Sequence, residues 1–227
     1  MKRAWMMAAG GLFALSLMAG VWVKAQSSGG AGYHAAAVAQ AGSIPYPMNS
    51  QAPGFVTLDV TLDASGTVQN VTVVRDVPPL TAAAQGAVKN WQFTAATADG
   101  QAAPGAVPVD VAFNPYNPSG VGLSGETLQP PSSTLSGDFQ PAALVKANYA
   151  VYPPNTVASG TVVMMVRVGS DGSVHRVRVL RGKGVLVDAA TAAVKTWGFT
   201  PATYKGSGVG ADVAVAFVFA SPQAGTR

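Results

Sequence analysis

The sequence predicts an α+β fold of two tandem, small β-β-α-β domains, each an antiparallel sheet with one helix packed on a face. Three observations support this prediction. The chain of 227 residues matches itself without a gap when it is shifted by 106 positions, so that residues 54–100 align with 160–206. In each copy, apolar residues first alternate with polar ones, as in a half-buried strand. They then recur every three or four residues, as on one side of a helix.

The first element along the chain is predicted to be an export signal. Residues 1–25 begin with Lys2 and Arg3, continue with 18 uncharged, mostly apolar residues from Met6 to Val23, and end in Val-Lys-Ala. Small residues at these last positions are typical of a signal-peptidase site. The alternative is an uncleaved membrane anchor, because 18 apolar residues are at the lower limit for crossing a bilayer. In either case the rest of the protein is exported, and we expect it in the periplasm.

Composition divides the exported part into four segments. Residues 26–41 are rich in Ala, Gly and Ser and are expected to be a flexible segment. The two copies of the domain span residues 42–113 and 142–221. Between them, residues 114–141 are rich in Gly, Pro and Ser, which predicts a linker.

Each copy is predicted to start with two strands joined by a tight turn. The first strand has apolar residues at every second position from Val56 to Leu62, and the second copy repeats this from Val162 to Val168. The segments DASG and SDG follow, and their residues tolerate the positive φ of a tight turn. Val68 and Val174 are out of phase with the valines after them, which predicts a bulge just after each turn.

A helix and a last alternating strand complete each copy. Leu80, Ala84 and Val88 lie on one side of the first predicted helix, and Trp91 follows near its end. The second copy repeats this pattern from Leu186 to Trp197. We expect both tryptophans to pack in the core rather than to bind a ligand.

The composition excludes several kinds of site. Without cysteine, the chain forms neither disulfides nor cysteine-based zinc sites. Its two histidines, His34 and His175, have no metal-ligand spacing. Asp59, Asp63 and Asp76 are interpreted as surface carboxylates, because the sequence indicates no apolar pocket around them. We therefore predict no catalytic site, no metal, no cofactor and no enzymatic activity.

Charge differs between the two halves of the exported chain. Residues 26–139 have two basic and seven acidic side chains, a net charge of −5, whereas residues 140–227 have nine basic and three acidic ones, a net charge of +6. The exported part therefore has a net charge of +1, with 11 basic and 10 acidic side chains. This nearly neutral balance gives no reason to expect nucleic acid as a partner.

The repeated motif resembles the C-terminal domain of TonB, the periplasmic energy transducer. The second copy has Tyr-Pro before its first strand, Gly-x-Val at the start of that strand, Asp-Gly in the turn and AAxxAVKxWxFTPA across the end of the helix. The first copy departs from this pattern, with Ala95 in place of Pro201 and Ser65 in place of Asp171.

This resemblance implies a non-catalytic, periplasmic protein-binding module that contacts an outer-membrane transport protein, such as a TonB-dependent receptor. In that family, the domain binds a short peptide of the transporter by adding it to the edge of the sheet. Two alternatives remain, a membrane-anchored energy transducer of TonB-dependent transport and a structural envelope protein. The family's anchor helix contains a Ser and a His, whereas residues 1–25 contain Ser16 but no His.

The candidate binding edge is the last strand of the second copy, from Val213 to Phe219, with Tyr152 and Pro153 beside it. A small open sheet leaves an unpaired edge to which another strand can add. The alternative is that this edge pairs with the first copy, or with itself in a homodimer. The expected partner-binding residues are Tyr152, Pro153, Val213, Val215, Phe217, Phe219, Arg167, Arg176 and Arg178.

The three arginines in this set are predicted to form a basic face on the hairpin of the second copy. Arg167 lies on one strand and Arg176 and Arg178 on the other, where the first copy has Thr61, Asn70 and Thr72. Like charges that face each other across strands disfavour the fold. We therefore expect this face to meet an acidic surface, either on the first copy or on an outside partner. The alternative is a solvated face without a partner.

Overall fold

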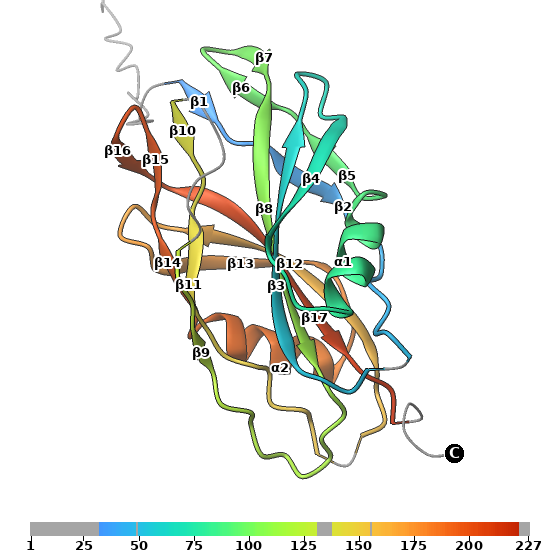
Figure 1. Ribbon diagram of the computed structural model, residues 1–227. Coiled ribbons are helices and arrows are strands. Elements are labelled where there is room, and N and C mark those ends of the chain that lie inside the picture. Colours follow the sequence, from blue (N-terminus) through green and yellow to red (C-terminus); the bar gives the residue numbers. More distant parts are fainter. Residues whose placement is uncertain (1–31, 49, 131–137, 155, 223–227) are drawn as a thin grey trace, which may run out of the picture.

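The computed structural model describes residues 32–48, 50–130, 138–154 and 156–222. The two copies of the repeat form two units with the same order of elements (Figure 1). Unit one consists of β1 (Tyr33–His34), β2 (Ala37–Gln40), β3 (Gly54–Leu62), β4 (Val68–Arg75), α1 (Leu80–Val88), β5 (Gln92–Thr94), β6 (Ala96–Ala98), β7 (Gln101–Ala103) and β8 (Gly105–Asn114). Unit two consists of β10 (Phe139–Gln140), β11 (Ala143–Ala147), β12 (Gly160–Val168), β13 (Val174–Arg181), α2 (Val185–Val194), β14 (Gly198–Thr200), β15 (Ala202–Tyr204), β16 (Ser207–Val209) and β17 (Ala211–Phe219). Between the units lies β9 (Glu126–Thr127).

The long strands of both units form one continuous six-stranded sheet, in the order β13-β12-β17-β8-β3-β4. Within each unit the long strands are antiparallel, as predicted. The last strands of the two units, β8 and β17, lie side by side in the middle of the sheet and pair in parallel. The predicted α+β fold with two repeated sheet-plus-helix units is confirmed, and the two sheets are joined.

The parallel pairing of β8 with β17 turns the units over relative to each other. Val109 corresponds to Val215 in the repeat, but it lies beside Ala214, so the register is offset by one residue. Neighbouring residues of a strand point to opposite faces of the sheet. Consequently, α1 packs on one face and α2 on the other, and each helix shares its core with residues of both units. We call the face of a unit that points away from its own helix its reverse face. On each side of the sheet, one unit is therefore covered by its helix, and the other unit presents its reverse face.

The segment before the first copy contains ordered strands, so the expectation that residues 26–41 are flexible is wrong for their described part. β1 pairs with β6, and β2 pairs with β5. Ala36 and Val38 are buried in the core of unit one. The run of small Ala side chains, which the composition suggested was a flexible segment, packs closely against the sheet. The corresponding strands of unit two are β10 and β11, so the repeat begins earlier than predicted.

The described parts of the predicted linker, residues 114–141, are also tied to the units. β9 pairs with β11. A carboxylate oxygen of Glu126 lies 2.7 Å from Nη2 of Arg75 in unit one, and the other accepts a hydrogen bond from the Tyr149 hydroxyl of unit two at 2.9 Å. This part of the chain therefore connects both units through side-chain contacts.

The predicted helices and bulges are confirmed. Leu80, Ala84 and Val88 of α1 are buried, and both Trp91 and Trp197 are 4% exposed. The register of each hairpin shifts just after its turn, where the out-of-phase valines predicted a bulge. Among the described residues, no helix is long and apolar enough to cross a membrane. The predicted signal peptide, residues 1–25, lies outside the described residues.

Candidate partner-binding surface

The strand that was expected to bind a partner lies in the interior of the sheet. β17 pairs with β12 on one side and with β8 of unit one on the other. Val213, Val215, Phe217 and Phe219 are at most 2% exposed. The expectation of an open edge at this strand is therefore wrong, and the alternative that it pairs with the first copy is what the structure has. The physical reason is that both faces of β17 are apolar, so a position between two other strands buries the most surface.

Tyr152 and Pro153, which were expected beside an open edge, also pack against the protein itself. Tyr152 is 2% exposed and packs its ring edge-to-face against Phe219, with centroids 5.8 Å apart. Its hydroxyl donates to the backbone carbonyl of Ala158. Pro153 is half-buried. The Tyr-Pro motif therefore anchors the segment before β12 and leaves the tyrosine little surface for a partner.

The three arginines lie together on the outer hairpin of unit two, as predicted. Arg167 on β12 is directly opposite Arg176 on β13, and Arg178 is opposite Met165. A guanidinium nitrogen of Arg167 lies 3.5 Å from a carboxylate oxygen of Asp212 on the next strand. The arginines and Asp212 line a pocket of about 290 Å³ together with Met165 and Val177. The acidic contact of Arg167 is thus within unit two, and the two units are joined through the sheet and not through this basic face.

The two outer edges of the long sheet are β4 in unit one and β13 in unit two. The main chain of β4 is partly covered by side chains. The Asn70 side chain accepts a hydrogen bond from the Val71 N–H at 2.9 Å, and the Gln85 side-chain amide donates to the Val71 carbonyl at 2.9 Å. The corresponding residues of unit two are Arg176 and Thr191, and among the described residues no side chain makes a hydrogen bond to the main chain of β13. Of the two edges, β13 is therefore the one whose main chain is less covered by side chains.

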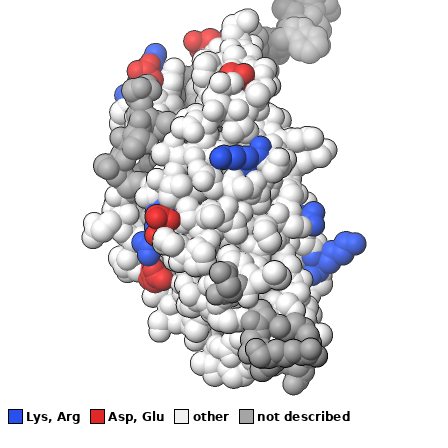
Figure 2. All heavy atoms as spheres, turned by 45° about the vertical axis from the view of Figure 1, so that its right-hand side comes forward, with Lys and Arg blue, Asp and Glu red and all other residues white. Residues whose placement is uncertain are grey.

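The edge strand itself is basic, since Arg176, Arg178 and Arg181 are three of the eight residues of β13, whereas charge is sparse over the chain as a whole. Figure 2 shows one side of the molecule, on which charged side chains are few and scattered over a mostly uncharged surface. Most side chains of β13 are exposed or half-buried, and Val179 is 41% exposed. His175, at the start of the strand, has its Nε2 3.5 Å from a carboxylate oxygen of Asp171. Among the described residues, no group of three or more acidic, His or Cys side chains is arranged to hold a metal ion.

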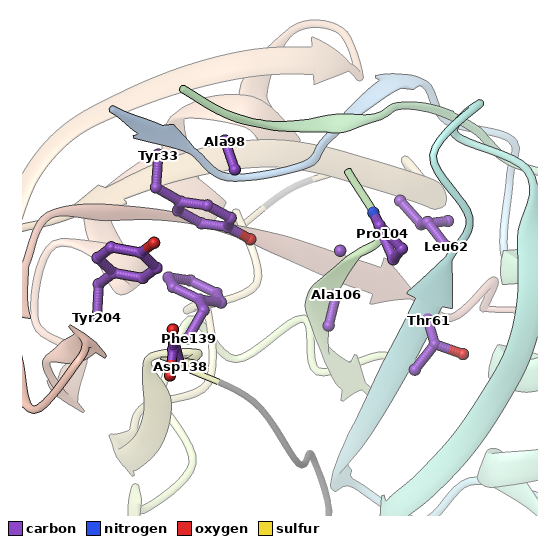
Figure 3. Close-up of a pocket in the computed structure, with 10 residues that line it drawn as sticks. Tyr33, Thr61, Leu62, Ala98, Pro104, Ala106, Asp138, Phe139 and Tyr204 are labelled. Carbon is purple, nitrogen blue, oxygen red and sulfur yellow. The ribbon is translucent and has the colours of Figure 1, made fainter. Parts of the chain in front are cut away.

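A second cavity, of about 340 Å³, lies where the ends of the two units meet (Figure 3). Tyr33 of unit one stacks on Tyr204 of unit two, with ring centroids 5.2 Å apart, and lies 4.8 Å from the ring of Phe139. Leu62, Pro104 and Ala106 form the opposite wall. Because the three rings pack mainly on one another, we interpret them as a contact that holds the ends of the units together.

Two carboxylates are buried that the sequence did not reveal: Asp59 was interpreted as a surface residue, and Asp110 was not singled out. Asp59, expected at the surface, is only 9% exposed, and Asp110 is 1% exposed. Burial raises the pKa of both groups, that of Asp110 to about 7. A signal existed in the repeat, because these two acids stand where the second copy has Met165 and Ala216.

Comparison with known proteins agrees with the repeat. A family model described as the Gram-negative bacterial TonB protein C-terminal matches residues 44–115 and again residues 148–220, together more than half of the chain. The chain has no significant match among curated proteins or among solved structures.

Proposed function

Because the chain belongs to the TonB C-terminal family, we propose that it is a periplasmic, non-catalytic module that binds an extended segment of an outer-membrane transport protein at β13. The family is one of protein-interaction domains of the Gram-negative envelope. An extended segment would add to the sheet as a seventh strand, with main-chain hydrogen bonds providing affinity.

The observation that carries this proposal is the difference between the two edges of the sheet. Side chains of Asn70 and Gln85 already occupy main-chain groups of Val71 on β4. On β13, eight residues long, no such cap exists among the described residues. An unpaired strand edge is a template for another strand, so β13 is the better acceptor.

The arginines would then select among segments. In an added strand, alternate side chains lie on the face of the sheet that carries Arg176 and Arg178. Acidic residues at those positions would relieve the repulsion between Arg167 and Arg176, and each favourable cross-strand pair contributes roughly 0.2–1 kcal/mol. We therefore expect a partner segment with acidic residues at every second position.

The test is nuclear magnetic resonance mapping of the isotope-labelled protein with a synthetic peptide from the periplasmic segment of an outer-membrane transporter. We expect amide shifts along β13 and none along β4. Two further peptides carry N-methyl groups on alternate residues, in opposite phase. Strand addition requires that only one of the two phases abolishes binding, because only alternate N–H groups face the sheet.

A matched control comes from the repeat itself. Replacing Arg176 by Asn and Arg178 by Thr gives β13 the residues of unit one, and should weaken binding of an acidic peptide without removing it. Exchanging the exposed Lys195 for Thr should leave binding unchanged. Equal effects of the two N-methylated peptides, or shifts confined to the helices, would refute strand addition at β13.

A further inference from the structure

A cavity of about 440 Å³ lies between the reverse face of unit one and the first strands of unit two. Its walls are partly apolar, with Leu144 and three prolines, Pro108, Pro141 and Pro201, and partly polar, with Gln140, Thr200 and Thr203 on the side of unit two. On the side of unit one, Thr57, Asp59 and Asp110 complete the wall. The volume is within the range of small-molecule binding sites.

The two carboxylates of this wall are neighbours on adjacent strands. Asp110 on β8 is directly opposite Thr57 on β3, and Asp59 is directly opposite Pro108, so Asp59 and Asp110 are diagonal neighbours on the same face. The Thr57 hydroxyl donates a hydrogen bond to Oδ1 of Asp110 at 2.8 Å. Oδ2 of Asp110 is buried and has no hydrogen-bond partner among the described residues. A buried carboxyl oxygen without a donor is unfavourable, and so indicates a missing partner.

Within the described part of the chain, no positive charge lies beside this pair in the cavity. The residues that line the cavity include no Lys, Arg or His. Burial is the main cause of the raised pKa of Asp110, and the nearby charge of Asp59 contributes to it. The fold therefore holds two acids together in a place where nothing in the described chain neutralises them.

The repeat shows that the fold does not need these acids. The corresponding residues of unit two are Val163 for Thr57, Met165 for Asp59 and Ala216 for Asp110. All three are buried in the core that contains α1. The same position of the same fold is thus filled by apolar side chains in one unit and carries an acidic cavity in the other.

We infer that this cavity is a binding site for a single organic cation, an ammonium or guanidinium group on a short apolar stem. The charged group would donate to Oδ2 of Asp110 and to Asp59, while the stem packs against Leu144 and the prolines. Such charge-assisted hydrogen bonds are the stronger kind. A metal ion fits less well, because these are two acids without a third ligand of that type. The cation could be a free amine or the Lys or Arg side chain of a peptide, and the experiment separates these sources.

The test is calorimetric titration of the full protein with n-butylammonium and n-butylguanidinium chloride, with n-butanol as the neutral control. The peptides Ala-Ala-Lys-Ala-Ala and Ala-Ala-Met-Ala-Ala represent the second source, and both are N-acetylated and C-amidated so that the Lys side chain is their one possible cation. We expect the cations to bind and the neutral molecules not to bind. Binding of the small cations alone indicates a free amine, and tighter binding of the Lys peptide indicates a peptide ligand. Titration near pH 6 should release protons, because a bound cation favours the ionised form of Asp110.

The variants Asp59→Asn and Asp110→Asn keep the size of the side chains, and each should weaken cation binding about tenfold or more. The double variant Asp59→Met, Asp110→Ala installs the residues of unit two and should abolish binding while the fold is retained, which circular dichroism checks. Asp212→Asn, an acid on the same sheet outside the cavity, is the control and should bind as the parent does. If no cation binds, or if the variants in the cavity bind as tightly as the Asp212 control, the inference is wrong.

Discussion

The two core tryptophans provide a test of the packing, because the repeat makes them a matched pair that differs in the hydrogen bond of the indole N–H and in the neighbouring rings. Both are 4% exposed. The indole Nε1–H of Trp197 donates to the Asn148 carbonyl at 2.9 Å, whereas that of Trp91 is buried and has no hydrogen-bond partner among the residues that the structure describes. The ring of Trp197 also lies 5.2 Å from that of Phe217 and 5.8 Å from that of Phe55.

Truncation of either tryptophan to Ala should lower the free energy of unfolding by about 3–5 kcal/mol, the usual loss for a large buried aromatic. Trp197→Ala should be the more costly of the two. It removes a hydrogen bond worth about 0.5–1.5 kcal/mol, while Trp91→Ala removes a buried donor that is itself unfavourable by about 1–3 kcal/mol. We therefore expect a difference of about 2 kcal/mol between the variants.

The assay is equilibrium unfolding in urea followed by far-ultraviolet circular dichroism, which does not depend on the tryptophans. Trp→Phe at both positions is the second pair, since Phe leaves a smaller cavity and isolates the hydrogen bond. Losses that agree within about 0.5 kcal/mol, or a larger loss at Trp91, would refute the assignment of the hydrogen bond as the main difference.

Three further predictions concern the acid pair, a turn and the N-terminus. Because burial raises the pKa of Asp110 to about 7, the folded protein keeps a proton that the unfolded chain loses near pH 4. The free energy of unfolding should thus fall between pH 4 and 7, by roughly 4 kcal/mol at most, and Asp110→Asn should remove a large part of this slope in urea titrations; an unchanged slope would contradict it. Gly172 has a φ of +81° and a Cβ there would clash with the Phe199 carbonyl, whereas Gly206, at +77°, faces open space. Gly172→Ala should therefore lower the melting temperature more than Gly206→Ala, which suffers only the conformational cost of about 1–2 kcal/mol; similar shifts would count against the turn geometry. Mass spectrometry of the exported protein should find Gln26 as its first residue, and an intact leader would instead favour the anchored transducer.

Local patterns in the sequence predicted the elements well, because they depend on neighbouring residues. The spacing of Leu80, Ala84 and Val88 predicted α1 and its buried side. The pairing of β8 with β17 was only an alternative, since it depends on residues 105 positions apart. A signal was present, because Val213 to Phe219 is apolar at every position, as is typical of a strand buried on both faces.

The buried pair of Asp59 and Asp110 could not be predicted for the same reason, because it depends on residues that are distant in the sequence. Asp59 alternates with Leu58 and Val60, so the local pattern places it on the solvent side of a half-buried strand. Only the arrival of unit two over the reverse face of unit one buries it and brings Asp110 beside it. Burial of this kind is a property of the assembled pair of units, and a single unit considered alone does not reveal it.

The parallel contact between β8 and β17 has a consequence for how the protein behaves on dilution. If the two units were separate chains, their contact would dissociate at low concentration and expose two strand edges. Here both are on one chain, so each unit experiences the other at an effective concentration in the millimolar range, as for modules joined by a short linker. Closure of these edges therefore does not depend on expression level. Covalent fusion also frees each copy from the requirement that both partners of a symmetric dimer carry the same surface. A substitution such as Met to Asp is then introduced once and not twice, which allows one copy to acquire a chemistry that the other lacks.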